Sequence, residues 1–289
     1  MADACNGVDT GFVALGFAKV AILGVVQGIT ELMPISSSAH MRIVPAVLGW
    51  QDPGAAFSAA MQLAALFAVV SYFWSDVASL AGGSLSAISR GRFGDPKLRL
   101  SFWIVLATIP LLVAGLAMAP ILNACNAPLR SITAIGVACL VMALLLAWVE
   151  MRARHFRTMR QAGLMDALLV GLAQVGSLIP GVSRSGSTLT AALGLGFKRE
   201  EAARFSFLLG IPAIAAAGLK ELWELHKVHL GSHGWSVLGL GIAVGAVSAF
   251  VTIWALMRIL ERVSAWPFVI YRALLGVLLI AGAAMGLLH

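Results

Sequence analysis

Charged residues are scarce in this chain, and their scarcity excludes an ordinary soluble protein. Only 11% of the 289 residues are Asp, Glu, Lys or Arg, whereas charged residues approach about a quarter of a soluble domain. Hydrophobic residues make up 60% of the chain, and the mean hydropathy is +0.93. We therefore interpret the chain as an integral membrane protein.

The sequence also lacks the alternating polar and apolar pattern of a lipid-facing β-barrel. Its apolar runs instead approach the roughly 20 residues that cross a hydrocarbon core as a helix. The first eleven residues contain no Lys or Arg, so we expect no cleaved signal peptide and a mature protein that starts near Met1. The predicted fold class is an all-α integral membrane protein, a single polytopic domain over residues 1–289.

Cysteine is scarce as well, and the three cysteines show no metal-ligand spacing. Cys139 falls within an apolar run, where a cysteine is usually a small buried residue. A disulfide between Cys5 and Cys125 is left open. The net charge of +7 comes from short loops between predicted spans, as the positive-inside bias requires, so we expect no binding to nucleic acid.

The two halves of the chain share an internal repeat. The segment "LGVVQG" at 23–28 reappears as "VGLAQV" at 170–175, which aligns Gln27 with Gln174 at an offset of about 147 residues. The segment "PISSSAH" at 34–40 corresponds in the same way to "PGVSRSG" at 180–186. The offset is about half the chain, and it predicts repeat halves at about 12–150 and 160–288.

Each half begins with two short apolar runs on either side of a break rich in proline and serine. We predict a re-entrant helical hairpin from each pair of runs, followed by about three transmembrane helices. An odd number of crossings inverts the second half, which gives an inverted-topology repeat. The hairpins are predicted at 12–33 with 36–49 and at 164–179 with 183–197, and the helices at 55–75, 100–119, 131–149, 202–222, 236–257 and 268–288.

Basic residues gather in four predicted loops, which this topology places on one face of the membrane. Short loops rich in Lys and Arg stay in the cytoplasm, so the N-terminus and the first hairpin are expected to open outward and the second hairpin inward. The longest loop, 78–100, is too short to build a core of its own. The basic residues are Arg90, Arg92, Lys97, Arg99, Arg152, Arg154, Arg157, Arg160, Lys198, Arg199, Arg204, Arg258 and Arg262.

Irregular backbone at membrane depth leaves N–H and C=O groups unpaired, and it is tolerated where protein or a water-filled cavity satisfies them. We therefore expect a cavity where the two breaks meet. Glu31 and Arg184 then become intramembrane charges, which usually mark substrate or ion sites. A purely structural ion pair is the alternative.

The second break, "PGVSRSGST" at 180–188, has the composition of a phosphate site. The N–H groups at a helix start attract anions, and arginine binds phosphate oxygens with two parallel hydrogen bonds. A turn that only caps the following helix is the alternative. The candidate residues are Ser183, Arg184, Ser185, Gly186 and Ser187.

The first break supplies groups for acid and base chemistry. Glu31 can bind a cation or exchange protons, and Gln27, one helical turn earlier, adds a neutral carbonyl oxygen. His40 is a candidate acid, base or nucleophile, because histidine titrates nearest neutral pH.

Hydroxyl groups and one more arginine complete the first break. Ser36, Ser37 and Ser38 are candidate nucleophiles or phosphate donors, or else caps of the following helix. Arg42, one turn beyond Ser38, either assists with charge or lies at the membrane interface. It is therefore left out of the core set.

With these residues in view, the chain resembles the bacterial undecaprenyl-diphosphatase family, also called the bacitracin-resistance protein family. The resemblance covers nearly the whole chain and depends on "QGITELMPISSSAH" at 27–40 and on "PGVSRSGST", which "FSFLLGIP" follows. It implies catalytic roles for Glu31, Ser37, His40 and Arg184. Many members have an acidic residue where this chain has Gln27, so Glu31 is expected to carry the acidic role alone.

The resemblance implies hydrolysis of undecaprenyl diphosphate to undecaprenyl phosphate and inorganic phosphate. This reaction recycles the lipid carrier of peptidoglycan synthesis and confers bacitracin resistance. The resemblance also implies Mg²⁺ or Ca²⁺ near Glu31 and Gln27, a homodimer, and a multi-pass protein of the inner membrane whose active site faces the periplasm.

Two questions stay open at this point. The attacking group is either an activated water or Ser37, with His40 moving the proton. The function itself has an alternative, a transporter or flippase of a polyprenyl phosphate lipid, because inverted repeats with broken helices are features of transporters.

Overall fold

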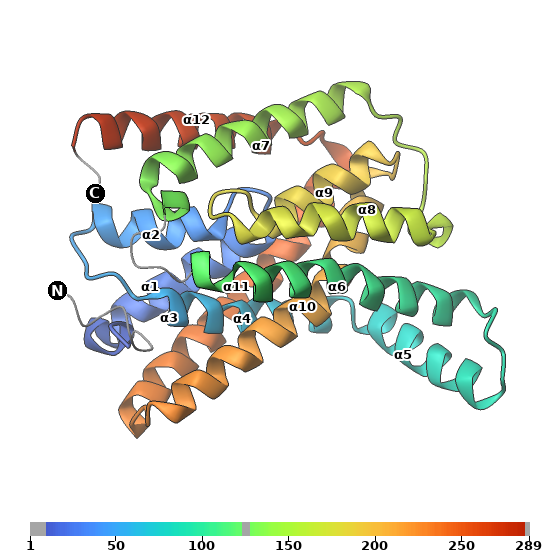
Figure 1. Cartoon of the computed structure of the whole chain (residues 1–289), viewed down its shortest axis with the longest axis horizontal. Coiled ribbons are helices and arrows are strands. Elements are labelled where there is room, and N and C mark those ends of the chain that lie inside the picture. Colours follow the sequence, from blue (N-terminus) through green and yellow to red (C-terminus); the bar gives the residue numbers. More distant parts are fainter. Residues whose placement is uncertain (1–9, 123–127, 287–289) are drawn as a thin grey trace.

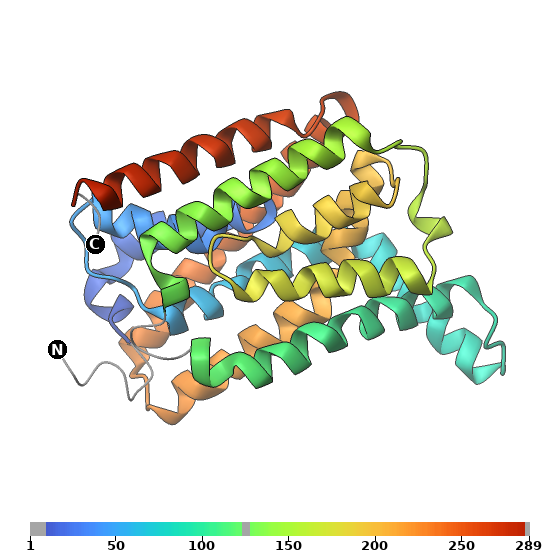
Figure 2. The same cartoon turned by 45° about the horizontal axis from the view of Figure 1, so that its top comes forward.

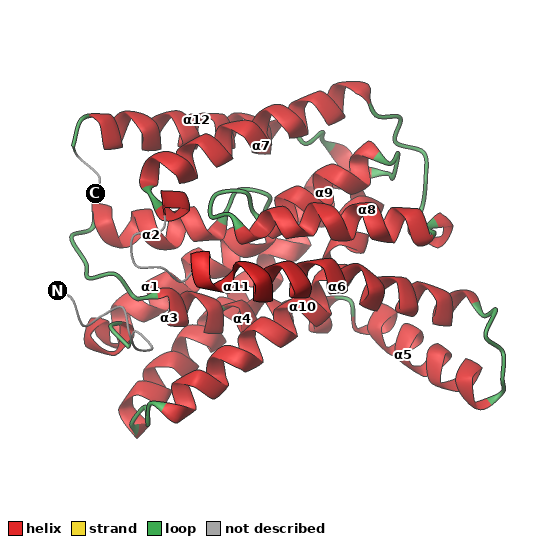
Figure 3. Ribbon diagram, viewed as in Figure 1, coloured by secondary structure: helices red, strands yellow, loops and turns green. Residues whose placement is uncertain are grey.

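The computed structural model describes residues 10–122 and 128–286, and the elements named over these residues are all helices (Figures 1 and 3). Within the described ranges the β-type pairing is one isolated bridge between Arg157 and Phe197. The all-α prediction is confirmed. The α-helices are α1 (Phe12–Leu32), α2 (Ser37–Val47), α3 (Ala55–Ala60), α4 (Gln62–Tyr72), α5 (Trp74–Ser89), α6 (Pro96–Leu122), α7 (Ile132–Arg152), α8 (Leu164–Val175), α9 (Arg184–Gly194), α10 (Arg199–Lys227), α11 (Ser232–Arg262) and α12 (Trp266–Ala284).

Six described helices are long and apolar enough to cross a membrane: α1, α6, α7, α10, α11 and α12. The segment Ala56–Tyr72, which contains α4 and most of α3, meets α5 at a bend of 79°, and the two add a seventh span if the pair is counted as one. Large apolar side chains are exposed on the outer faces of α6, α7 and α12, as lipid contact requires. They include Phe102, Val113, Leu116, Leu144, Trp148, Leu274 and Leu278. The chain is thus a multi-pass membrane protein.

The sequence predicts a loop over 78–100, and this prediction is wrong for its first half, where α5 continues to Ser89. Asp76 lies in the first turn of α5 and favours the helix start through its negative charge. The helix docks on α6, where the Ser84 hydroxyl donates to Ser101 Oγ at 2.9 Å. This tertiary contact stabilises a segment whose paired glycines favour a loop.

Two interrupted helical pairs enter the molecule from opposite ends. The α1–α2 pair comes from the end where the N-terminus lies, and the α8–α9 pair comes from the other end (Figures 1 and 2). The breaks that link the helices of each pair, 33–36 and 179–183, meet in the middle of the molecule. This arrangement brings the polar residues of both halves together.

Glycines allow the entering helices to lie directly against the backbone of longer ones. A Cβ added to Gly24 or Gly28 of α1 would lie 2.7 or 2.4 Å from the carbonyl oxygens of Gly241 and Gly245 on α11. In the same way, a Cβ on Gly171 of α8 would lie 2.4 Å from an α6 carbonyl oxygen. Small residues spaced by four are the usual means by which membrane helices approach closely.

Ion pairs tie together the segments at the end opposite the N-terminus. The guanidinium of Arg157 donates two hydrogen bonds of 2.7 Å to the Asp166 carboxylate. These bonds raise the pKa of Arg157, so its charge is maintained. Two further pairs link this end: Arg199 with Glu150, and Arg204 with Asp76.

Cys139 is buried in α7, as expected, whereas Cys5 and Cys125 lie outside the described residues. A disulfide between them therefore stays an open question.

The contact between α1 and α11 can be tested with glycine substitutions. We expect Gly28→Ala to lower the free energy of unfolding by about 1–3 kcal/mol, because its methyl group would overlap the backbone of α11. Gly239→Ala is the matched control, since an added Cβ there meets nothing within 4 Å. Thermal unfolding in detergent measures both, and equal stability of the two variants would contradict the packing.

Candidate functional site

The two breaks satisfy each other's backbone groups. The Ser185 hydroxyl donates to the carbonyl oxygens of Glu31 and Met33, each at 3.1 Å. In return, Ser38 Oγ accepts the N–H of Gly181 at 3.2 Å. These contacts join residues about half the chain apart, so the site is a tertiary feature formed by both halves.

A serine begins the second helix of each pair in the same unusual conformation. Ser36 and Ser183 have φ values of +75° and +69°, which are uncommon for residues with a side chain. Each hydroxyl oxygen accepts the N–H three residues later, from Ala39 at 3.4 Å and from Gly186 at 3.2 Å. Both serines therefore cap a helix, the alternative role that the sequence left open.

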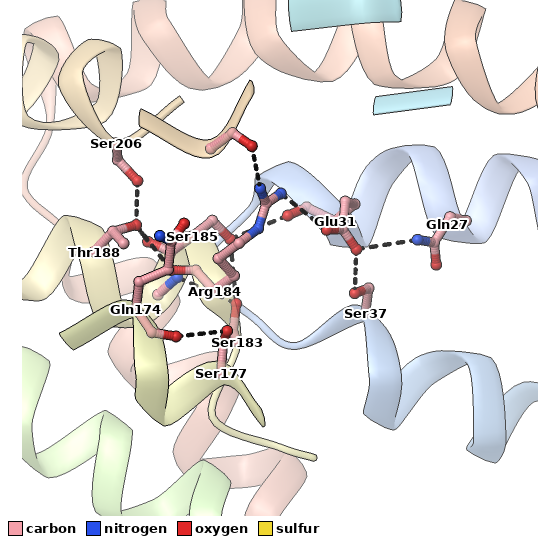
Figure 4. Close-up of polar contacts among 12 residues, drawn as sticks. Gln27, Glu31, Ser37, Gln174, Ser177, Ser183, Arg184, Ser185, Thr188 and Ser206 are labelled. Atoms are coloured by element: carbon pink, nitrogen blue, oxygen red, sulfur yellow. Dashed lines mark hydrogen bonds and ion pairs between the residues drawn. The ribbon is translucent and has the colours of Figure 1, made fainter. Parts of the chain in front are cut away.

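Glu31 is the centre of a buried polar cluster (Figure 4). Glu31 is only 6% exposed. One carboxylate oxygen, Oε1, accepts from Arg184 Nη2 at 3.1 Å. The other, Oε2, accepts from Gln27 Nε2 at 3.0 Å and from Ser37 Oγ at 2.5 Å. The structure thus brings together four of the predicted site residues, three from the first half and one from the second.

Arg184 points toward Glu31 and α10. Its Nη1 donates to the carbonyl oxygen of Gly210 at 3.1 Å, and a Cβ at Gly210 would lie 2.6 Å from that nitrogen. Both ends of the guanidinium therefore have protein partners. Because a charge pair inside a membrane protein needs such partners, the Glu31–Arg184 pair has a clear structural role.

His40 is placed beside a tyrosine from the last helix. Its Nδ1 lies 2.7 Å from the carbonyl oxygen of Ser36, which can only accept, so Nδ1 carries the proton. In the neutral ring, Nε2 then accepts a hydrogen bond from the Tyr271 hydroxyl at 2.6 Å. The two ring nitrogens of His40 therefore contact Ser36 and Tyr271, with neither bonded to Glu31 or Ser37.

A cavity of about 220 Å³ opens beside this cluster. Ser37 and Gln27, which both contact Glu31, form part of its wall, and Arg184 does not line it. Gln27 Oε1 is buried and has no hydrogen-bond partner among the described residues. The cavity is lined by Gln27, Ser37, Ser38, Met41, Arg42, Asp52, Gly54, Ser58, Ala59, Gln62, Arg130, Ile135 and Pro180.

Most of the predicted phosphate-binding residues have structural partners. Ser38 lines the cavity, whereas Ser36 and Ser183 cap helices and Ser185 bonds to the first break. Ser187 donates to the carbonyl oxygen of Arg184 at 3.0 Å. The predicted phosphate roles of this set remain predictions.

Arg272 of α12 is a site residue that the sequence reasoning missed. Although it is only 1% exposed, it donates to the carbonyl oxygen of Pro34 at 3.0 Å and to those of Gly181 and Val182 at 2.8 and 2.9 Å. It therefore holds the first break against the second. An arginine inside the apolar run "WPFVIYRALLGVLL" is the signal that could have identified it.

Gly186 makes room for this arginine. A Cβ at Gly186 would lie 2.6 Å from Arg272 Nη1. Gly186, one of the predicted phosphate-binding residues, therefore packs against the guanidinium of Arg272, and its phosphate role remains a prediction.

Fold and site together define an all-helical membrane protein with a buried polar cluster where two interrupted helical pairs meet. The particular family follows from comparison with known proteins. Residues 20–278 match the family described as bacitracin resistance protein BacA, and the chain belongs to this family.

Curated relatives agree over nearly the whole length. The chain is 72% identical to undecaprenyl-diphosphatase 2 of Mesorhizobium japonicum over 260 residues, which cover 90% of this chain and 98% of the relative. It is 47% identical to the undecaprenyl-diphosphatase of Gloeobacter violaceus over 95% of this chain and 94% of the relative. Identity to that of Trichormus variabilis is 42% over 98% of this chain and 89% of the relative.

The junction formed by Arg272 can be tested with Arg272→Lys. A single ammonium cannot replace a guanidinium fork that serves carbonyl groups of both breaks, and each buried carbonyl left unpaired costs about 1–3 kcal/mol. We expect a lower thermal midpoint in detergent. The control is Arg258→Lys, at an exposed position of α11, and an Arg272→Lys midpoint equal to that of the control would contradict the assignment.

Proposed function

We propose that this chain hydrolyses undecaprenyl diphosphate to undecaprenyl phosphate and inorganic phosphate, and so recycles the lipid carrier of peptidoglycan synthesis and confers bacitracin resistance. Family membership and the names of the relatives support this proposal. The structural observation that carries it is the 2.5 Å hydrogen bond from Ser37 to Glu31 at the wall of a cavity. A hydroxyl bonded to a buried carboxylate has the arrangement of an activated nucleophile.

In this mechanism the polyprenyl tail stays in lipid while the diphosphate enters the cavity beside Ser37. Ser37 Oγ attacks the terminal phosphorus and gives its proton to Glu31. The bond from that phosphorus to the bridging oxygen breaks, and undecaprenyl phosphate leaves. Water then attacks the phosphoserine and the bond from phosphorus to Ser37 Oγ breaks. Glu31 returns its proton to Ser37 Oγ, and inorganic phosphate leaves. Because phosphoryl transfer depends on positioning and charge, the buried cluster suits it.

Arg184 and His40 support this chemistry in different ways. Arg184 holds the Glu31 carboxylate in place and compensates its charge. His40 carries protons through Nε2, and the Tyr271 hydroxyl is the group that this nitrogen meets. The direct contact between Ser37 and Glu31 favours Glu31 as the base for Ser37 over His40.

A divalent cation fits the donor set at this cavity. Mg²⁺ and Ca²⁺ prefer oxygen ligands, and Gln27 Oε1 is a buried carbonyl oxygen without a partner among the described residues. Glu31, Gln27 and Ser37 would hold the ion, which when bound would neutralise charge on the transferred phosphoryl group. Over the described ranges no three or more His, Cys, Asp or Glu side chains group as a metal site, so the ion would depend on this mixed set of oxygen ligands.

We also propose that the two halves are inverted repeats with re-entrant hairpins. Corresponding helices make corresponding contacts, since α1 packs on α11 as α8 packs on α6. Although α1 has the length of a span, it turns at Gly16, where φ is +71°, and residues 17–32 rise only about 24 Å. That is shorter than a hydrocarbon core of about 30 Å.

The proposed location is the inner membrane, with the cavity facing the periplasm. The basic loops lie at the end of the molecule opposite the N-terminus, and basic loops stay in the cytoplasm (Figure 1). The cavity is lined by the segments around Asp52 and Arg130, which lie between helices at the other end.

The homodimer implied by the resemblance stays part of the proposal. A carrier function is not favoured, because the relatives described above all have phosphatase names.

The proposed activity is tested by phosphate release from undecaprenyl diphosphate in detergent, where no second compartment exists. We expect the parent to release phosphate, EDTA to abolish the release, and Glu31→Gln to lower turnover at least about 100-fold, because a general base is lost. Glu261→Gln, at an exposed position near the end of α11, is the control. A well-folded parent without activity, or a Glu31→Gln variant as active as the control, refutes the proposal.

The proposed orientation is tested with single cysteines in a cysteine-free background. Gln51 and Ser89 are exposed. Gln51 lies between α2 and α3 and Ser89 ends α5, and these segments are at opposite ends of the molecule (Figure 1). In spheroplasts, a membrane-impermeant thiol reagent should label Gln51→Cys at once and Ser89→Cys only after lysis. The reverse pattern would place the cavity on the cytoplasmic side.

A further inference from the structure

The cavity beside Ser37 has its own positive charges, and they differ from the arginine of the buried cluster. The ionisable residues that line it are Arg42, Arg130 and Asp52. Arg184 lies outside the lining and is paired with Glu31. An anion that enters the cavity therefore meets Arg42 and Arg130 as its cationic neighbours.

The two arginines come from different elements and converge. Arg42 lies on α2, one helical turn beyond Ser38, and is half-buried. Its Nη1 donates to the backbone carbonyl oxygen of Arg130 at 2.8 Å. The carbonyl holds the Arg42 side chain in place and uses only part of its guanidinium fork.

The charges of this arginine pair are not compensated by neighbouring carboxylates. Among residues 10–122 and 128–286, no carboxylate lies within ion-pair distance of either guanidinium. Asp52 lines the same cavity, but its Oδ1 accepts the N–H of Gly54 at 2.8 Å. The lining therefore carries more positive than negative charge.

Cavity size and chemistry fit a phosphate or diphosphate oxyanion. The hydroxyls of Ser37 and Ser58 already donate to Glu31 and to the carbonyl oxygen of Gly54, so beside the arginines the lining offers the hydroxyl of Ser38 and the amide of Gln62. Such groups donate hydrogen bonds to phosphate oxygens, and arginine binds these oxygens with two parallel bonds. An anion taken out of water needs this compensation, because burial of an unpaired charge is very costly.

We propose that Arg42 and Arg130 form an anion subsite that binds phosphate oxygens next to the phosphorus that Ser37 attacks. The identity of the natural ligand rests on the proposed function: the oxygens belong to the diphosphate of the substrate or to the released inorganic phosphate. Arg42 lies farther along α2 from the break than Ser37 does, and so closer to the end at which the cavity is proposed to open. Anions entering or leaving the cavity thus pass the arginine pair.

The first experiment measures anion binding to the full-length protein in detergent by titration calorimetry, with inorganic pyrophosphate and inorganic phosphate as separate probes. We expect Arg42→Gln and Arg130→Gln each to weaken binding about tenfold, because each removes a charge-assisted contact. Arg42→Lys keeps the charge without the fork, and we expect an intermediate affinity. Arg258→Gln, on the exposed face of α11, is the control for net charge.

The second experiment separates the two sources of the phosphate. If the subsite holds the substrate diphosphate, Arg42→Gln raises KM for undecaprenyl diphosphate about tenfold and weakens inhibition by pyrophosphate. If it holds the product, the variant instead weakens inhibition by inorganic phosphate and leaves KM unchanged. Either result supports the subsite, and both differ from the loss of turnover expected for Glu31→Gln.

The subsite is overturned if the parent binds neither anion, or if Arg42→Gln and Arg130→Gln match the control in binding, in KM and in inhibition. Failure of the proposed function gives a different result. If the parent hydrolyses no undecaprenyl diphosphate but binds pyrophosphate through Arg42, the subsite is supported and the proposed phosphatase activity is refuted. If the parent hydrolyses the lipid and neither arginine is needed, the phosphatase activity is supported and the subsite is refuted.

Discussion

The structure depends on one constraint, that backbone groups exposed by two helix breaks must find partners where the bilayer offers no water. Each break uses the other for this purpose. The carbonyl groups of both breaks accept hydrogen bonds from Arg272, and Ser38 and Ser185 cross between them. An unpaired polar group in an apolar medium costs several kcal/mol, so these contacts hold the two halves in one relative position. The site therefore forms where the backbone is least regular.

The same constraint explains why charges are tolerated at the junction. Glu31 is surrounded by three donors, and Arg184 and Arg272 are surrounded by acceptors. A buried ion pair contributes little net stability, because desolvation offsets the attraction of its charges. In the proposed function its value is preorganisation, since the Glu31 carboxylate already accepts a hydrogen bond from Ser37. The free-energy cost of burying these charges is offset by packing elsewhere, in particular by the close contacts of α1 with α11 and of α8 with α6.

Two sets of positive charge lie near Ser37, and they differ in their partners. Arg184 forms an ion pair with Glu31 and helps to hold the buried cluster together. Arg42 and Arg130 face the cavity without a carboxylate partner among the described residues. A site that must receive a highly charged headgroup and release a charged product needs the second kind as well as the first. Sequence motifs identify Arg184 more readily than Arg42 and Arg130, because Arg184 lies directly at a break rich in proline and serine.

The sequence by itself determined the helical membrane fold, the main spans and the two breaks, because hydropathy and proline act locally and can be counted along the chain. It also indicated Glu31, Ser37 and Arg184 as neighbours, since the predicted inverted repeat would bring both breaks to one place. Only the tertiary structure decided that Ser37 contacts Glu31, that His40 turns to Tyr271, that Arg272 joins the breaks and that Arg42 meets Arg130. It also decided that α5 is helical, by docking it on α6. The physical reason is that these contacts join residues distant in sequence or depend on side-chain direction, and neither is encoded in local composition.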